Sequence, residues 1–447
     1  MMKILCALTV LVPFVFAANA ADVSYSKDVV PLLRRNCQGC HRPAKMKGDL
    51  DMTTYAALVK GGKHAPEFKA GDMSSLILEQ VRGAEPKMPP DGDKLTAEEM
   101  ALLERWIKDG AKDDTPTGPA KIDVAVYKVP PVISAMAISP DGNTVAISGY
   151  HEVLLHKSDG SGLIARLQCE SPRVESLAFS HDGKLLAASG GMPGMFGEIL
   201  IWDTTTNKLN ASYKISADSL FGVSFSPDAE RVAFGGADKS VRMITVKDGK
   251  ELLKFDNHAD WVFGTTFTVD GKRILTGSRD KAMKLISADN AQFIDDVNKL
   301  LEPILCIARN PKEDFVVYGG ALGTARIYKI SDNQQRTAAN NDVNMMKTFE
   351  RQPGPIRAAA YSPDASLVAL GGLYDDVRVY KAADATKVAT LTGMNGTFNL
   401  AFHPDGKQLF VGGFDGTLRI FEIPSGKLIK SFIPVPIAGG EKKSAAL

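Results

Sequence analysis

Cys37, Cys40 and His41 are the residues of this 447-residue chain whose types and spacing indicate the most specific chemistry. They read C-x-x-C-H, the spacing at which a c-type haem is attached. The two thiols can add to the haem vinyl groups as thioethers, and the histidine that follows directly is placed to bind the iron as the proximal axial ligand. The pentapeptide therefore predicts one covalent haem c.

Three other uses of such a cysteine pair are possible. A zinc site would need a second ligand pair, and the sequence has no other C-x-x-C or close His/Cys pair. A thioredoxin-like redox pair would lie in a βαβ unit, whereas Arg42-Pro43 and a lysine-rich turn follow here. A structural disulfide suits an exported protein but gives no reason for His41. We expect haem.

A methionine in a rigid turn is the predicted sixth ligand of the iron. The stretch K-M-P-P places Met88 before Pro89 and Pro90, and two prolines restrict the backbone. Met/His ligation is a standard arrangement in cytochromes c. The alternative is a methionine that only fills the core. The rival ligands are Met46, Met52, Met73 and His64.

Short helices are expected to position these residues. Apolar spacing predicts one helix over residues 25–36, weakened or begun by Pro31, and a second over residues 76–81. A third begins after Thr96, carries Trp106 on its apolar face and ends at Gly110.

The order C-x-x-C-H, K-M-P-P and L-T-x-E-E…L…W-I-x-x-G-A resembles the small class I cytochrome c domain of planctomycete-type multidomain proteins, over residues 22–112. In that family the Met-Pro-Pro loop supplies the distal ligand and the W-I-x-x-G-A helix closes over the haem. The resemblance implies that Met88 is the distal ligand and that Pro89 and Trp106 contact the haem, which Cys37, Cys40 and His41 hold.

A different pattern begins near residue 122: strand, tight turn, strand ending in Gly-Gly or Ser-Gly, turn, strand. The tight turn is typified by Ser139-Pro140-Asp141-Gly142 and occurs seven times, with starts at residues 139, 180, 226, 268, 310, 362 and 403. Proline presets φ, aspartate bonds back to the turn and glycine takes the left-handed position. A period near 40–45 residues with four short strands indicates a β-propeller.

These repeats resemble the WD-repeat family, although only Trp202-Asp203 is an actual Trp-Asp pair. Seven repeats imply seven blades over residues 122–435. The predicted fold class is thus multidomain: a small all-α cytochrome c domain followed by an all-β, seven-bladed propeller. Either residues 122–128 or residues 427–434 are expected to form the outer strand of the last blade.

The remaining segments complete the expected domain organisation. Lys3, the apolar run 4–16 and Ala18-Asn19-Ala20 fit a signal peptide over residues 1–20, and no other apolar run is long enough to span a membrane. The cytochrome domain covers residues 21–114, a proline- and glycine-rich linker residues 115–121, and a flexible tail residues 436–447. The mature protein is expected to be periplasmic or otherwise exported.

Other residues that carry chemistry are interpreted as structural. Cys169 and Cys306 lie in apolar strands, and lone cysteines there are usually buried. His181 and His403 fall on tight turns and are expected to be solvated, whereas His258 occupies the place of a structural histidine within a blade. His151 and His156 show no metal spacing. Two insertions, residues 191–197 and 333–351, are expected to be recognition loops or disordered spacers.

These observations favour a mono-haem electron carrier whose propeller docks a redox partner protein or complex. With 53 Lys+Arg against 52 Asp+Glu, nucleic acid is not an expected partner. No nucleophile–base pair, phosphate loop or catalytic carboxylate pair stands out, which disfavours an enzyme. Peripheral association with a membrane complex is left open. One alternative is a redox enzyme whose propeller holds a second cofactor or substrate site, a layout that resembles the periplasmic nitrite reductases with a haem-d propeller. The other is a haem-bearing scaffold or sensor.

Overall fold

The computed structural model describes residues 22–42, 45–63, 66–90, 93–115, 126–299, 301–331 and 342–438. The chain divides into two compact units, one up to residue 116 and one from residue 117. The expected signal peptide, most of the expected linker and residues 439–447 lie outside the described residues. Within the described ranges, no helix has the length and apolar character needed to cross a bilayer.

The first unit is built from short helices around one small hairpin. Its elements are the π-helical turn η1 (Tyr25–Val29), α1 (Val30–Asn36), β1 (His41–Arg42), β2 (Lys45–Met46), the 3₁₀ turn η2 (Lys47–Asp49), α2 (Tyr55–Lys60), α3 (Leu76–Val81) and α4 (Ala97–Lys108). The single helix expected over residues 25–36 is therefore divided in two. Pro31 lies in the first turn of α1, where the missing N–H has no helical partner to lose.

Helix α4 follows the sequence prediction closely. The Thr96 side chain accepts a hydrogen bond from the Glu99 N–H, and the Glu99 carboxylate accepts one from the Thr96 N–H, which closes a capping box. The helix ends at Lys108 with Asp109 as its C-cap, and Gly110 follows with φ of +100°. Its buried face carries Leu103, Trp106 and Ile107.

An aromatic cluster forms the centre of this unit. The Trp106 ring stacks on Tyr25 at 5.4 Å and lies 5.0 Å from Phe68. Its indole N–H donates to the Lys112 carbonyl at 3.1 Å. Helix α2, which the sequence analysis did not predict, adds the fully buried Leu58.

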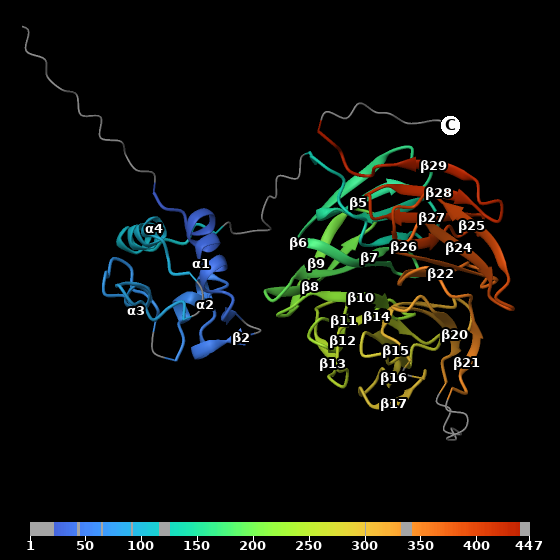
Figure 1. The fold of residues 1–447 in the computed structure, drawn as a ribbon, viewed down its shortest axis with the longest axis horizontal. Helices are drawn as coiled ribbons and strands as arrows, with labels where there is room; N and C mark the ends of the chain where they lie inside the picture. The colour runs from blue at the N-terminus through green and yellow to red at the C-terminus, as the bar shows by residue number, and fades with distance from the viewer. Residues whose placement is uncertain are drawn as a thin grey trace, which may run out of the picture. The chain divides into compact units, whose positions relative to one another are not determined.

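The second unit consists of antiparallel sheets that follow one another around a common centre (Figure 1). In the described residues it has one seven-stranded and five four-stranded sheets. The seven-stranded sheet holds β3 (Met136–Ile138), β4 (Thr144–Ser148), β5 (Tyr150–Lys157), β6 (Leu163–Phe179), β7 (Leu185–Met192), β8 (Phe196–Asp203) and β9 (Lys208–Ser216).

The four-stranded sheets take their strands in chain order. The first holds β10 (Leu220–Phe225), β11 (Arg231–Gly236), β12 (Val241–Thr245) and β13 (Glu251–Phe255). The second holds β14 (Val262–Phe267), β15 (Arg273–Ser278), β16 (Lys284–Ser287) and β17 (Phe293–Asp296). The others hold β18 (Ile304–Arg309), β19 (Phe315–Gly320), β20 (Ala325–Lys329), β21 (Met345–Thr348); β22 (Ile356–Tyr361), β23 (Leu367–Gly372), β24 (Asp376–Lys381), β25 (Lys387–Thr392); and β26 (Thr397–Phe402), β27 (Gln408–Gly413), β28 (Leu418–Glu422), β29 (Leu428–Phe432).

The long strand β6 explains why the first sheet has seven strands. Its residues up to Gln168 pair mainly with β5, and Arg173 to Phe179 pair with β7. Two repeats of the sequence thus share one continuous strand. The first strand of each repeat lies beside the first strand of the next: β3, the second half of β6, β10, β14, β18, β22 and β26, which in turn lies beside β3. We call these the inner strands.

The tight turns have the geometry that their sequence predicts. In the first, the Gly142 N–H donates to the Ser139 carbonyl at 2.9 Å, with φ of +76° at Gly142. Asp141 accepts hydrogen bonds from the Ser139 hydroxyl and the Asn143 N–H. The same turn recurs with Ala229 and Ala365 at the left-handed position, at φ of +58° and +65°.

The two ends of the propeller meet without competing for one place. Strand β29 pairs with β28, so C-terminal residues form the outer strand of the last sheet. Tyr127 instead forms a parallel bridge with Ile437, where its N–H donates to the Pro436 carbonyl at 2.8 Å. Its hydroxyl donates to Glu152 at 2.6 Å, and Glu152 also pairs with Arg166. Of the two segments that the sequence offered for the outer strand of the last sheet, it is therefore residues 427–434 that contain this strand.

The two predicted insertions differ in outcome. Residues 191–197 extend the β7–β8 hairpin, with Met192 paired to Phe196. In residues 333–351, the sequence interpretation was too broad, because Met345–Thr348 is strand β21 and Phe349 is buried. Residues 332–341 lie outside the described part of the chain.

Candidate functional site

A cavity of about 590 Å³ in the first unit brings together the residues that the sequence analysis singled out. Cys37, Cys40, His41, Met88 and Pro89 all line it. Further wall residues are the apolar Leu50, Leu76, Ile77 and Val81. The end of α1, the β1 hairpin, α3 and the K-M-P-P loop therefore meet around one space.

The C-x-x-C-H segment is a compact turn at the end of α1. The Cys37 N–H donates to the Leu33 carbonyl at 2.8 Å, and the N–H groups of Cys40 and His41 both donate to the Cys37 carbonyl at 3.1 Å. Both thiols are free. Burial, with a contribution from the Glu99 carboxylate, raises the pKa of Cys37 to about 11. The turn places both thiols and the imidazole on the cavity wall.

The His41 ring is oriented by a backbone carbonyl. Its Nδ1 lies 2.9 Å from the Lys47 carbonyl oxygen, which can only accept a hydrogen bond. Nδ1 therefore carries the proton, and Nε2 keeps its lone pair. Burial lowers the pKa of His41, which favours the neutral imidazole that binds metals. In metal sites, the orientation of a ligating histidine is usually fixed by a hydrogen bond of this kind from its other ring nitrogen.

Two thioethers, Met88 and Met52, reach the cavity. The Met88 N–H donates to the Gln80 carbonyl at 2.8 Å, which ties the K-M-P-P loop to α3. Met52 is bound to the C-x-x-C-H segment itself: its N–H donates to the His41 carbonyl at 3.0 Å, and the Gln38 side chain donates to its carbonyl at 2.7 Å.

The other rival ligands lie elsewhere. Met73 packs against the core of the unit and Met46 is exposed, while His64 lies outside the described residues. Trp106 lies in the aromatic cluster and is not among the described residues that line the cavity.

Sequence reasoning missed one contributor to this site, the Lys47 carbonyl, and named another, Met52, only as a rival ligand. The Lys47 carbonyl has no signature in sequence, because any residue type supplies it; only the β1–β2 hairpin brings it to His41. Met52 was one of several candidates, and nothing in its local sequence separated it from Met46.

The donor set fits a covalent haem c. It offers two thiols, an imidazole with a free ring nitrogen, thioethers and an apolar wall, and Lys47 and Lys63 at the wall could pair with carboxylates. The volume lies within the range of about 300–1,000 Å³ usual for cofactor pockets. A metal site of protein ligands alone has less support, since the described residues contain no group of three or more His, Cys, Asp or Glu arranged to hold an ion.

The histidines of the propeller serve structural roles. His258 is buried, with Nδ1 2.7 Å from Asp280 and Nε2 2.8 Å from Thr276, which confirms its place within a blade. His181 is exposed, as expected. The solvated role expected for His403 was wrong: its Nε2 lies 3.0 Å from the Gly142 carbonyl oxygen, so it links the last sheet to the first.

The remaining candidates of the propeller also have structural surroundings. The Nε2 of His156 lies 2.8 Å from the Pro434 carbonyl oxygen. Cys169 is buried and Cys306 half-buried, both in strands.

Comparison with known families agrees with both halves of this description. The family model described as Planctomycete cytochrome C matches residues 37–92. The WD domain, G-beta repeat model matches residues 249–287, and that of the anaphase-promoting complex subunit 4 WD40 domain matches residues 359–436. The second unit is a propeller with segments similar to WD repeats, and the first contains a segment similar to the planctomycete cytochrome c model.

Several curated proteins are similar to part of this chain. Superkiller complex protein 8 of Dictyostelium discoideum is 33% identical over 97 residues, 22% of this chain and 31% of that protein. From the same organism, the periodic tryptophan protein 2 homolog is 20% identical over 275 residues (61% and 28%), and protein tipD is 24% identical over 369 residues (75% and 56%). The matches thus span about a third or less of the first two relatives and about half of the third.

Proposed function

We propose that the first unit binds one covalent haem c and carries single electrons, and that the propeller docks it to a redox partner protein. The observation that carries the proposal is the meeting of Cys37, Cys40, His41 and Met88 on one cavity, with Nε2 of His41 left free by the Lys47 carbonyl. A bound haem supplies one-electron Fe(III)/Fe(II) chemistry.

Each residue of the site has a distinct role in this proposal. The Cys37 and Cys40 thiols anchor the cofactor, and His41 is held in the tautomer that presents Nε2 to the iron. The apolar side chains of α3, Ile77 and Val81, exclude water from the cavity. If His41 and a thioether of the cavity both held the iron, no position would be left there for a substrate, which is why we propose a carrier and not an enzyme.

Met88 is the proposed distal ligand in preference to Met52. Met52 is bound through its backbone to the segment that carries His41. Met88 arrives on a separate loop, attached to α3 and followed by Pro89 and Pro90. A thioether on an independent loop could be held at the cavity separately from the segment that carries His41.

The docking role is supported by the class of protein that the second unit resembles. WD-repeat propellers commonly mediate protein–protein contacts, and one relative is by its name a component of the Superkiller complex. We further propose that the sheets form seven blades, with β6 shared by the first two. Export to the periplasm, where bacterial haem c is attached, completes the proposal.

The test is the spectrum of the full chain produced in a periplasm that can attach haem c. Wild type should carry one haem that survives denaturing electrophoresis, with a methionine–iron charge-transfer band. Met88→Ala should lose that band and keep the covalent haem. Met52→Ala is the matched control, since Met52 lines the same cavity.

Three results would contradict the proposal in different ways. Absence of covalent haem from the matured wild type would remove the haem site altogether. Loss of the band in Met52→Ala, with Met88→Ala unchanged, would move the distal ligand to Met52. A second chromophore or metal in the propeller would indicate the redox enzyme.

A further inference from the structure

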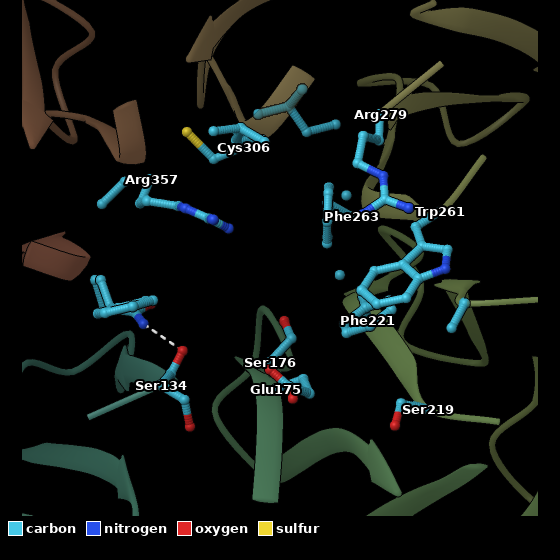
Figure 2. Close-up of a pocket in the computed structure, with 18 of the residues that line it drawn as sticks. Ser134, Glu175, Ser176, Ser219, Phe221, Trp261, Phe263, Arg279, Cys306 and Arg357 are labelled. Carbon is cyan, nitrogen blue, oxygen red and sulfur yellow. Dashed lines mark hydrogen bonds between the residues drawn. The ribbon is translucent and has the colours of Figure 1, made fainter. Parts of the chain in front are cut away.

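A second cavity, of about 680 Å³, lies at the centre of the propeller unit (Figure 2). Side chains from the beginning of six inner strands and from Ser134, just before β3, line it. The cavity is therefore the mouth of the central channel, on the side where the inner strands begin. Its volume is that of a small-molecule pocket.

The inner strands reach this cavity through a repeated irregularity. In β6, β10, β14, β18, β22 and β26, the register with the neighbouring strand shifts near the start of the strand. Such a bulge re-aims a side chain away from the regular ladder. Each shift contains a residue that lines the cavity: Glu175, Gly222, Phe263, Leu305, Arg357 and Phe398. The shift in β10 also contains Val223, which is not among the lining residues. Each of these six inner strands thus contributes a residue of its bulge to the channel mouth.

Two of these bulge residues are charged, and they differ in their surroundings. Glu175 has a partner, because the Nε of Arg173 lies 3.2 Å from its carboxylate. Arg357 extends into the cavity in Figure 2, and its Nε is buried with no hydrogen-bond partner among the described residues. An unsatisfied buried donor costs stability. In β18 the same position holds Leu305, so the fold does not need a cation here.

An aromatic wall faces Arg357 across the cavity. Phe221 stacks on Trp261 with ring centres 5.8 Å apart, and Phe263 lies 6.1 Å from Trp261. The Arg279 guanidinium lies over the Trp261 ring, 4.4 Å from its centre, and both its Nε and Nη2 bind Asp260 at 2.8 Å. The charge of Arg279 is therefore already compensated, which leaves Arg357 as the cation of the cavity without a carboxylate partner in the described residues.

We propose that this channel mouth binds a small aromatic carboxylate, with its carboxylate on the Arg357 guanidinium and its ring against Phe221, Trp261 and Phe263. A guanidinium fork suits a carboxylate, and its charge-assisted hydrogen bonds are the strong ones. The proposal goes beyond the proposed electron transfer and does not depend on haem.

The test is titration calorimetry of the full chain with N-acetylphenylalanine, which carries the ring and the carboxylate. N-acetylphenylalanine amide, which lacks the charge, should bind at least roughly tenfold more weakly. Arg357→Leu, which copies the residue of β18, should abolish this preference and keep or raise the melting temperature. Arg351→Gln is the control, because Arg351 is exposed, binds the Leu322 carbonyl and lies outside the cavity lining.

Three results would overturn the proposal. Equal affinity for acid and amide would remove the role of Arg357. Binding of phenethylamine in place of the acid, abolished by Glu175→Gln, would make this a cation site. Binding of a twelve-residue peptide with a carboxyl-terminal phenylalanine, but not of the free acid, would identify the ligand as the end of a partner chain. Arg357→Lys, which keeps the charge, should retain part of the affinity and guards against misfolding of the leucine variant.

Discussion

The His258 network shows how a single buried side chain holds one sheet of the propeller together. Both ring nitrogens are within hydrogen-bond distance of Asp280 and Thr276, so the segment before β14 is bound to β15 and to the turn that follows it. Each such bond contributes about 1 kcal/mol, and a buried partner left unsatisfied costs more.

We expect His258→Ala to lower the free energy of unfolding of the propeller by about 2–4 kcal/mol, because Asp280 and Thr276 lose their partner. Urea denaturation at pH 7 measures this. His181→Ala is the control, since His181 is exposed, and should change the midpoint little. Equal midpoints for the two variants would show that the network does not stabilise the fold.

The raised pKa of Cys37 gives a second prediction at this scale. Because burial raises this pKa to about 11, roughly one molecule in a thousand carries the Cys37 thiolate at pH 8. Alkylation of Cys37 by iodoacetamide in haem-free protein should be slow and should accelerate about tenfold per pH unit up to pH 11. Mass spectrometry of the peptide follows the reaction. Fast modification at pH 8 would mean that the thiol is not buried before haem is attached.

Only part of the residue-scale chemistry could be predicted. Cys37, Cys40 and His41 are neighbours in sequence, and a single turn brings them together. The Lys47 carbonyl requires a chain reversal, and Arg357 looks like any strand arginine until the bulge in β22 directs it into the channel. Sites made by tertiary geometry leave no local pattern.

The tight turns allow a test at the scale of elements. Ala365 occupies the left-handed position of its turn with φ of +65°, where Gly406 stands in the next repeat at +70°. A Cβ costs about 1–2 kcal/mol in this conformation. Ala365→Gly should therefore raise the stability of the propeller by roughly 0.5–1 kcal/mol, after the entropy that glycine loses on folding.

The reciprocal variant controls for the site. Gly406→Ala should lower the stability by about 1 kcal/mol by strain alone, since an added Cβ meets no atom within 4 Å. Thermal unfolding of both variants shows whether each substitution raises or lowers the stability. A loss of stability in Ala365→Gly would show that this turn adopts another conformation.

Elements with strong local signals were predicted well. The capping box of α4 and the Pro-Asp-Gly turns are determined within four residues. Helix α2 has only six residues and a weak apolar pattern, and strand β21 follows a polar stretch that reads as a loop. In both, packing against neighbours decides the structure where propensity does not.

At the scale of the molecule, acid should destabilise the propeller through its turn carboxylates. Hydrogen bonds from Ser180 and Lys184 lower the pKa of Asp182 to about 2, and those from Ser362 and Ser366 do the same for Asp364. For Asp280, burial acts to raise the pKa, but bonds from His258 and two backbone amides bring it to about 2.

A carboxylate with a lowered pKa in the folded state stabilises the protein above its usual pKa near 4, and this contribution is lost as the pH falls through the folded-state value near 2. The melting temperature should therefore be flat from pH 7 to about 5 and fall between pH 4 and 2. The melting temperature of Asp280→Asn should be lower between pH 7 and 5 and should fall less steeply between pH 4 and 2. An identical slope in this variant would exclude Asp280 from the acid transition. Solvent screens the exposed turn aspartates, so each of them contributes less.

The propeller architecture could be predicted from the spacing of the repeats, but the strand that completes the last sheet could not. Seven turns at regular spacing indicate a propeller, whereas residues 122–128 and 427–434 both have the composition of an edge strand. In the structure, β29 pairs with β28 as the outer strand, and Tyr127 forms a bridge with Ile437 instead. Which of two similar segments pairs with β28 depends on contacts far apart in sequence.

The Tyr127–Ile437 bridge means that the two ends of the propeller lie side by side. Such a molecule is suited to circular permutation. Residue 438 can be joined to residue 126 by about five glycine and serine residues, and new termini can be opened in the exposed turn at Asp289-Asn290, between β16 and β17. The permuted propeller should fold with the same sheets, and its thermal transition would show how much of the cooperativity resides in the contacts and how much in the order of synthesis.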